Sequence, residues 1–264
     1  MLVAAERRVS PLPHSRAVDT CLVICGPTGA GKTRLVLQMS DALDLLAVSA
    51  DSRQVYRGFD IGTAKPTISD RQRVPHACLD LAEPTIRFTA YRWAEEADRA
   101  IAGWRGSARL PLLVGGAGFY IRALVHPATD SEPHGFARLA AHYLLVDPGA
   151  SLREQIAMRA AAMAAGGWPE EVEQLINTVP ADAPAWQASG YRAMRAYVTG
   201  QVSLATAVER VTILTRQYAK RQRTWFRHQL PAARVTRLDP TDPTAIVRAL
   251  AWVRQRTAIP GSTG

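Results

Sequence analysis

Residues 26–33 read GPTGAGKT, a loop pattern that strongly restricts the structure around it. Before the loop, Thr20–Cys25 is a short apolar run typical of a strand, and after it Lys32–Leu43 carries apolar residues at helical spacing. Glycines let such a loop wrap closely around an anion, and the helix that follows points its first N–H groups at it. The sequence therefore predicts a phosphate-binding loop between a strand and a helix. The residues expected to bind the phosphate are Gly26, Pro27, Thr28, Gly29, Ala30, Gly31, Lys32 and Thr33.

The next hundred residues continue this alternation of strands and helices. We expect further strands at Leu45–Ser49, Leu110–Val114 and His142–Val146, and an amphipathic helix at Tyr91–Trp104. Strands that alternate with helices form a parallel sheet that is covered on both faces. The sequence therefore predicts an α/β fold like that of the P-loop NTPases, with helices on both faces of a parallel sheet and an additional C-terminal helical part.

After Ser151 the apolar spacing becomes helical. The first expected helix is rich in alanine and runs to about Ala165. Three further helices are expected at Pro169–Asn177, Ala185–Val198 and Ser203–His228, followed by a strand at Val235–Leu238 and a helix at Thr244–Arg256. These elements divide the chain into a flexible N-terminal tail (1–19), a P-loop core (20–150), a helical region with a basic helix (151–230), and a C-terminal strand and helix that return to the core (231–264).

Composition excludes several classes of protein. The 264 residues are 47% hydrophobic, which suits a soluble protein with one sizeable core. Cys21, Cys25 and Cys78 are too few and too scattered for a disulfide framework or a zinc site, and no apolar run approaches the ~18 residues needed to cross a bilayer. We therefore expect a cytoplasmic monomer without a membrane partner. The formal net charge of +9 favours a polyanionic partner.

Asp51 follows the second expected strand directly. Neighbouring parallel strands end at the same edge of a sheet, so this carboxylate should lie near the mouth of the phosphate-binding loop. A carboxylate in that place can act as a base, hold Mg²⁺ through water or cap a local turn. The position of Asp51 alone does not decide among these roles.

The sequence around Asp51 is more specific. Residues 51–67 read DSRQVYRGFDIGTAKPT, and VPHACLD follows at 74–80. LPLLVGGAGFY at 110–120, GYR at 190–192 and TRQYAKRQRTWFR at 215–227 continue the pattern. Together with the loop at 26–33, these strings resemble the tRNA dimethylallyltransferase family. The resemblance keeps its order over most of residues 21–227.

The resemblance implies an activity and its residues. Enzymes of this family transfer a dimethylallyl group from dimethylallyl diphosphate to N6 of adenosine 37, in the anticodon loop of tRNA, and release diphosphate. By this resemblance Asp51 is the general base, Lys32 and Arg216 are catalytic groups that bind the departing diphosphate, and Thr33 holds the cofactor Mg²⁺. The adenosine must leave its stack to reach such a crevice. The implied tRNA contacts are Asp51, Ser52, Arg53, Gln54 and Ala117.

A basic segment supports a polyanionic partner. Between Glu209 and Arg237 there are eight basic residues and one acidic residue. Four cations fall within about 60° of one another on the expected helix, namely Arg216, Lys220, Arg223 and Arg227. The opposite side, which we expect to pack, carries Val211, Leu214, Tyr218 and Trp225. Like charges on one face repel unless an anion offsets them, so we expect diphosphate, RNA backbone or both to bind there, with a simply solvated helix face as the alternative. Residues Lys220, Arg223 and Arg227 are expected to contact tRNA.

Two departures from the family pattern leave other functions open. Ala117 stands where members usually have threonine, and only the stretch from His126 to Ala141 replaces an insertion that grips the anticodon stem. A shorter chain is compatible with an enzyme that prenylates free AMP, or with a tRNA-binding remnant of weakened activity. The basic helix favours tRNA over AMP, and the intact loop and Asp51 argue against a remnant.

Overall fold

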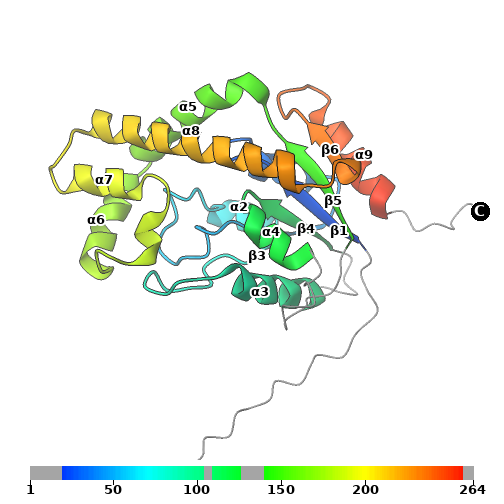
Figure 1. Cartoon of the computed structure of the whole chain (residues 1–264), viewed down its shortest axis with the longest axis horizontal. Coiled ribbons are helices and arrows are strands. Elements are labelled where there is room, and N and C mark those ends of the chain that lie inside the picture. The colour runs from blue at the N-terminus through cyan, green and yellow to red at the C-terminus, as the bar shows by residue number, and fades with distance from the viewer. Residues whose placement is uncertain (1–19, 104–108, 126–139, 258–264) are drawn as a thin grey trace, which may run out of the picture.

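The computed structural model describes residues 20–103, 109–125 and 140–257. The expected tail at 1–19 and nearly all of the short segment at 126–141 lie outside these residues. Six strands form one parallel sheet in the order β3-β2-β4-β1-β5-β6 (Figure 1). The strands are β1 (Thr20–Cys25), β2 (Leu45–Ala50), β3 (His76–Ala77), β4 (Leu110–Gly115), β5 (Ala140–Val146) and β6 (Val235–Leu238). The expected parallel sheet is therefore confirmed.

Helices cover both faces of this sheet, as the alternation of its buried side chains requires. Leu22 and Ile24 of β1 pack with α1 (Lys32–Met39) and α9 (Ala245–Thr257). Val23 and Cys25, which point the other way, pack with α3 (Ala90–Gly103) and α4 (Gly118–Val125). The predicted α/β arrangement with two covered faces is thus confirmed.

The remaining helices form a second layer of structure beside the carboxyl edge of the sheet. They are α5 (Leu152–Ala165), α6 (Trp168–Thr178), α7 (Tyr191–Val198) and α8 (Leu204–Gln229), with short 3₁₀ turns η1 (Gly149–Ser151), η2 (Pro184–Gln187) and η3 (Ala232–Arg234). The short helix α2 (Ile68–Arg73) lies between β2 and β3 in the chain. Helix α8 packs on α5 and α7 and continues across the core to α4 (Figure 1). It therefore joins the helical part to the P-loop core.

Aromatic packing fixes the segment after β2 against these helices. The ring of Phe59 lies 4.8 Å from that of Tyr191 and 5.2 Å from that of Trp186, and all three side chains are buried. Trp168 packs edge-on against Tyr191 at 5.4 Å. The segment that begins at Asp51 is thereby held between the sheet and the helical part.

Two local expectations differ from the structure. The single helix expected at Ala185–Val198 is divided, because Gly190 adopts a left-handed φ of 92° and α7 begins only at Tyr191. The expected packing face of α8 is confirmed only in part, since Val211 is buried but Leu214 is 43% exposed. The buried residues of this helix are Ala207, Val211, Thr212, Ala219, Gln222 and Phe226. Small residues dominate this face, which lets α8 lie close to the core.

The chain end returns to the sheet. Strand β6 pairs in parallel with β5, with Val235 beside Tyr143, and α9 packs on α1. Among the helices of the described residues, none has the combination of length and apolar character needed to span a membrane.

Candidate active site at the carboxyl edge of the sheet

The loop at 26–33 connects β1 to α1, and its backbone requires glycine at three positions. A Cβ on Gly26 would lie 2.1 Å from the carbonyl oxygen of Val146, and Gly29 and Gly31 both have a φ of 83°. Residues with side chains rarely adopt this left-handed conformation. The Lys32 ammonium folds over the loop and donates to the carbonyl oxygens of Gly26 and Pro27, each at 2.9 Å.

Gln222 of α8 ties this loop to the end of β4. Its Oε1 accepts a hydrogen bond from the backbone N–H of Thr28 at 2.7 Å, and its Nε2 donates to the carbonyl oxygen of Gly116 at 3.0 Å. A Cβ on Gly116 would lie 2.2 Å from Nε2, so this contact depends on glycine. Gln222 was not among the site residues expected from the sequence. A polar residue on the buried face of α8 opposite a Gly-Gly pair was the signal that could have revealed it.

Two adjoining cavities lie between the loop, the segment after β2 and helices α5 and α8. The phosphate cavity has a volume of about 220 Å³ and polar walls that include Gly31, Lys32, Thr33, Gln54 and Lys65. The apolar chamber has a volume of about 60 Å³, and its walls include Ile156, Ala160, Met163, Trp168 and Val211. The residues common to both walls are Thr28, Gly29, Asp51, Thr63 and Arg159.

Asp51 therefore lies where the phosphate cavity meets the apolar chamber. Its Oδ1 accepts a hydrogen bond from the backbone N–H of Arg53 at 2.8 Å. This contact caps the turn after β2 and fixes the direction of the carboxyl group. The carboxylate thus caps a local turn, one of the roles that its position in the sequence left open, and it also lines both cavities.

Two cations lie beside Asp51. Burial lowers the pKa of Lys32 to about 8, an effect that Asp51 opposes and Arg159 reinforces. Burial also lowers the pKa of the Arg159 guanidinium, again against the attraction of Asp51. Arg159 belongs to the Ala-rich helix α5, where nothing in the sequence distinguished it from a surface arginine. These charges make the junction of the two cavities attractive to an anion.

The structure does not bring every predicted residue to these cavities. Arg216 is absent from the walls of both, and its guanidinium donates to the carbonyl oxygen of Arg153 through Nη2 at 3.0 Å and Nε at 3.3 Å. Ala117 and Ser52 are also absent from these walls, and the Ala117 N–H donates to Ala50 at 3.0 Å. Arg53 and Gln54 each line one cavity.

The predicted stripe of cations on α8 is partly neutralised within the protein. Arg223 binds Asp147 through Nε at 2.8 Å and Nη2 at 2.5 Å, and it also donates to the carbonyl oxygen of Gly149. The expected repulsion is therefore offset partly by an internal carboxylate, which is a correction to the argument for a bound anion. Lys220 and Arg227 are exposed.

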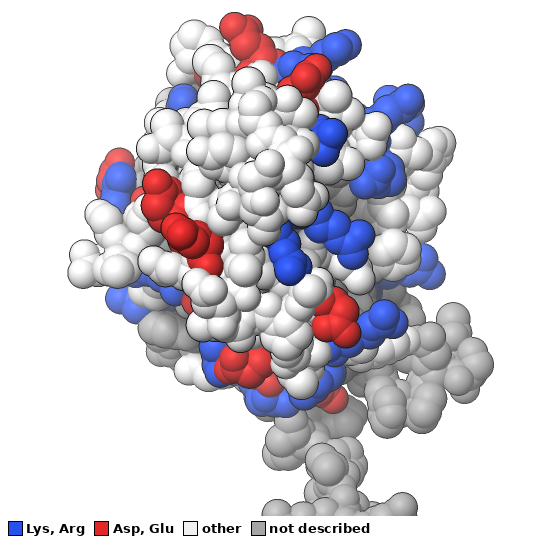
Figure 2. Space-filling view, turned by 90° about the vertical axis from the view of Figure 1, so that its left-hand side faces the viewer, with Lys and Arg blue, Asp and Glu red and all other residues white. Residues whose placement is uncertain are grey.

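An open basic cavity adjoins the apolar chamber on its outer side. It has a volume of about 660 Å³, and because Arg53, Arg192 and Arg221 line it, we call it the arginine mouth. Tyr218 lines both this mouth and the chamber, as do Arg53, Ala188 and Ser189. The Arg221 guanidinium carbon lies 5.8 Å from the centre of the Tyr218 ring. Burial raises the pKa of Tyr218 to about 12, so its hydroxyl stays protonated. At the helical end of the molecule, Lys and Arg side chains follow one another down the right-hand half of the view (Figure 2).

Known proteins share this sequence and this fold. The IPP transferase family model matches residues 54–142 and 128–229. The tRNA dimethylallyltransferase of Synechocystis is 36% identical over 272 residues, covering 80% of this chain and 88% of the relative, and that of Acaryochloris marina is 33% identical over 268 residues, covering 78% and 89%. Both alignments are longer than this chain, so the relatives contain segments that have no counterpart here.

Solved structures agree with these relatives. The crystal structure of the tRNA isopentenylpyrophosphate transferase from Bacillus halodurans superposes with a TM-score of 0.77 at 26% identity, covering 90% of this chain and 96% of that one. The corresponding transferase from Staphylococcus epidermidis gives a TM-score of 0.78 at 23% identity, covering 90% and 98%, and supports the fold. Sequence, family and fold thus agree, and the chain belongs to the IPP transferase family of enzymes.

Proposed function

We propose that this protein transfers the dimethylallyl group of dimethylallyl diphosphate to N6 of adenosine 37 in the anticodon loop of tRNA. The observation that carries the proposal is the position of Asp51 at the junction of a polar, cationic cavity and an apolar chamber. A prenyl diphosphate has the same division, with a charged end and a hydrocarbon end. The curated relatives named above carry the corresponding name, tRNA dimethylallyltransferase.

The walls of the two cavities suit the two ends of the donor. Loop N–H groups, Lys32 and the N-terminus of α1 provide positive charge for a diphosphate in the phosphate cavity. Apolar side chains of α5 and α8, among them Ile156, Ala160 and Val211, provide a water-poor place for the five-carbon group. In this pose the carbon–oxygen bond that breaks lies close to Asp51.

The reaction then needs a base and a stabilised leaving group. The N6 lone pair attacks the allylic carbon, the bond from this carbon to the diphosphate oxygen breaks, and Asp51 takes the proton that N6 loses. Negative charge grows on the leaving oxygen, where Lys32 from the wall of the phosphate cavity and Arg159 from the walls of both cavities can stabilise it. Arg216 joins them only if its side chain leaves the Arg153 carbonyl.

The donor set fits the proposed Mg²⁺. Thr33 supplies a hydroxyl to the phosphate cavity, and Asp51 and Asp70 supply carboxylates. Within residues 20–103, 109–125 and 140–257, no group of three or more His, Cys, Asp or Glu side chains forms a metal cage. Mg²⁺ typically binds through few protein ligands and through substrate phosphates, so Thr33 and the diphosphate would hold it. When bound, it supplies charge neutralisation on the diphosphate.

The arginine mouth suits the RNA side of the reaction. Arg53, Arg192 and Arg221 can neutralise backbone phosphates on either side of the target nucleotide. The adenosine must be extruded from its stack to pass Tyr218 and reach Asp51, because the chamber is too narrow for a paired or stacked strand. In this pose N6 would approach the allylic carbon from the side opposite the diphosphate, as displacement there requires.

Transfer of label tests this function. The purified protein is incubated with dimethylallyl diphosphate labelled in the dimethylallyl group, together with unmodified tRNA or, separately, AMP, and the RNA is digested to nucleosides. We expect label in N6-dimethylallyladenosine from tRNA. The Asp51→Asn variant should lose transfer, whereas Asp41→Asn, a change at an exposed surface carboxylate that pairs with Arg73, should retain it.

The same experiment distinguishes the alternatives. Label in AMP but not in tRNA would identify an adenylate prenyltransferase, and tRNA binding without any transfer would identify a remnant. Neither alternative is favoured by the relatives, which are named tRNA dimethylallyltransferases. Either result would contradict the proposed function.

A further inference from the structure

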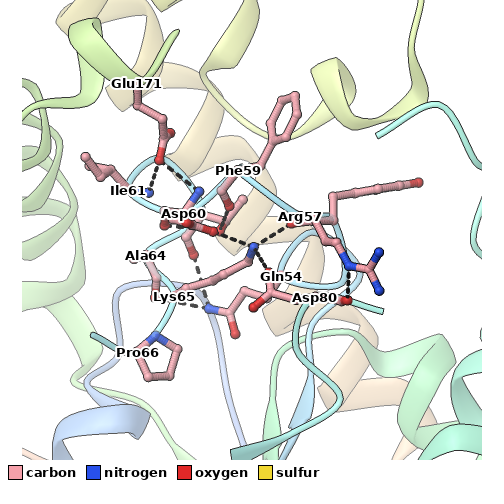
Figure 3. A network of polar contacts seen from close by, with 12 residues as sticks. Gln54, Arg57, Phe59, Asp60, Ile61, Ala64, Lys65, Pro66, Asp80 and Glu171 are labelled. Carbon is pink, nitrogen blue, oxygen red and sulfur yellow. Dashed lines mark hydrogen bonds and ion pairs between the residues drawn. The ribbon is translucent and has the colours of Figure 1, made fainter. Parts of the chain in front are cut away.

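Lys65 is a buried cation just outside the reacting centre. Its side chain is 1% exposed, and its ammonium contacts the carbonyl oxygen of Tyr56 at 2.5 Å and Oδ1 of both Asp60 and Asp80 at 2.6 Å (Figure 3). Three acceptors use all three N–H donors of an ammonium. Although Lys65 forms part of the wall of the phosphate cavity, it has no donor left for a substrate.

The partners of Lys65 enclose the segment that carries Asp51 and Gln54. Gln54 Nε2 donates to the carbonyl oxygens of Thr63 at 3.2 Å and Ala64 at 3.1 Å, and its Oε1 accepts from the Ser49 hydroxyl at 2.9 Å. The backbone N–H of Asp80 donates to the carbonyl oxygen of Gln54 at 3.2 Å. Lys65 therefore links Asp60 to Asp80, and Asp80 in turn contacts the backbone of Gln54.

The backbone near Lys65 is strained. In the part of the chain that the structure describes, the residues other than glycine with a positive φ are Ala64 (49°), Cys78 (63°) and Asp80 (57°). Two of them adjoin or bind Lys65, and the third lies two residues from Asp80. Residues with side chains rarely adopt this conformation, and it persists only where the surroundings hold it. The ammonium and its carboxylates provide this restraint.

Glu171 holds the same segment from the helical part. Its Oε2 accepts from the backbone N–H groups of Asp60 at 2.9 Å and Ile61 at 2.6 Å (Figure 3). Its Oε1 accepts from the Tyr191 hydroxyl at 2.7 Å. The segment is therefore fixed on one side by Lys65 and on the other by α6. Thr63 and Asp51, which line both cavities, lie within the part so fixed.

We propose that Lys65 is a positioning residue for the transfer reaction: by joining Asp60, Asp80 and the Tyr56 carbonyl, it holds the turn of Asp51 and Gln54 at the junction of the two cavities. This inference rests on the proposed function. Because Lys65 acts through the segment and not on the diphosphate, its loss should reduce the rate of transfer more than the affinity for the donor.

The test uses the full chain with Lys65→Met, which keeps the length of the side chain and removes its charge. We expect kcat to fall by roughly 10- to 100-fold, the loss that a small misplacement of a reacting group causes, with KM for dimethylallyl diphosphate within about twofold. Hydrogen–deuterium exchange should accelerate by about tenfold or more over residues 52–66 and stay unchanged in α9, which lies on the other face of the sheet.

Neutralising a partner should restore part of the rate. In Lys65→Met the Asp60 and Asp80 carboxylates lose their shared cation, although Asp80 keeps the partly exposed Arg71 at 3.1 Å. The double variant Lys65→Met/Asp80→Asn should therefore transfer about fivefold faster than Lys65→Met alone. Asparagine tolerates the positive φ of this position. If Lys65→Met does not fold, Asp60→Asn, at a half-exposed partner, should show the same changes in kcat and exchange to a smaller degree.

Each outcome has one meaning. Lower thermal stability with a wild-type kcat would overturn the positioning role, and so would a rise in KM without a fall in kcat, since it would make Lys65 a diphosphate ligand. Unchanged exchange over residues 52–66 would also overturn it. Absence of transfer in the wild-type protein would refute the proposed function instead, and the exchange measurement would still decide whether Lys65 holds the segment.

Discussion

Replacement of Gln222 by methionine tests whether α8 holds the phosphate-binding loop in place. Gln222 is 6% exposed and hydrogen-bonds to the Thr28 N–H and to the Gly116 carbonyl, and its side chain also contacts the Tyr218 hydroxyl. Methionine has a similar length and helix propensity, so the change removes these bonds and little else. Each buried group left without a partner costs about 1–3 kcal/mol. Because water can reach the half-buried Thr28, we expect the free energy of unfolding to fall by about 2–4 kcal/mol in total.

Urea denaturation followed by circular dichroism measures this loss, with Gln217→Met as the matched control. Gln217 is an exposed glutamine on the same helix, and its replacement should change the free energy of unfolding by no more than about 0.5 kcal/mol. For dimethylallyl diphosphate, kcat/KM should fall by roughly tenfold in Gln222→Met, since the loop loses its fixed position. Equal stability of the two variants would refute the view that Gln222 restrains the loop.

Three further predictions concern the charges of the site. Because the pKa of Lys32 is about 8, its positive charge is present below pH 8 and lost above it. KM for dimethylallyl diphosphate should therefore rise between pH 7.5 and about pH 9. The variant Lys32→Arg stays charged and should not show this rise. Arg159→Met should raise KM or lower kcat more than Arg216→Met, as steady-state kinetics would show, because only Arg159 lines the cavities; the reverse order would assign the diphosphate to Arg216. Lys220→Ala should weaken tRNA binding, and in filter binding the dependence of log affinity on log salt concentration should become shallower by about 1. Arg223→Ala should chiefly lower thermal stability, because Asp147 already binds this guanidinium. Equal salt dependence in both variants would contradict this distinction.

Local patterns made much of the fold predictable. The sequence of the loop at 26–33 predicts its conformation. A side chain at Gly26 would collide with the backbone of Val146, and Gly31 adopts a left-handed φ that other residues rarely adopt. The apolar runs of β1, β2, β4 and β5 predicted the parallel sheet. Strands that are buried on both faces are apolar at nearly every position, so they stand out in the sequence as continuous apolar runs. Asp51 could be placed at the edge of the sheet for the same reason.

Residues that act through distant contacts could not be predicted in this way. Arg159 and Gln222 reach the site from helices that lie more than a hundred residues along the chain from the loop, and helical periodicity does not state which loop a helix will cross. Glu171 and Lys65 serve a segment whose path depends on packing against Trp168 and Tyr191.

The packing face of α8 shows the same limit. Bulky apolar residues such as Leu214 suggested one side of this helix, but the buried side combines Val211 and Phe226 with the small residues Ala207, Thr212 and Ala219 and with Gln222. A helix that must approach a glycine-rich loop closely needs small residues and hydrogen-bonding groups where hydrophobic content alone would place leucine. The choice of face was therefore decided by what the helix covers.

The central claim is that Asp51 removes a proton from an adenosine while the neighbouring cavity holds a prenyl diphosphate. Its most direct test compares Asp51→Asn with the wild-type protein, in one preparation each, for transfer of labelled dimethylallyl to unmodified tRNA and for binding of dimethylallyl diphosphate by isothermal titration calorimetry. The account predicts that transfer falls by about 100-fold or more while the dissociation constant for the donor changes by less than about threefold. Undiminished transfer, or a loss of donor binding as large as the loss of transfer, would contradict it.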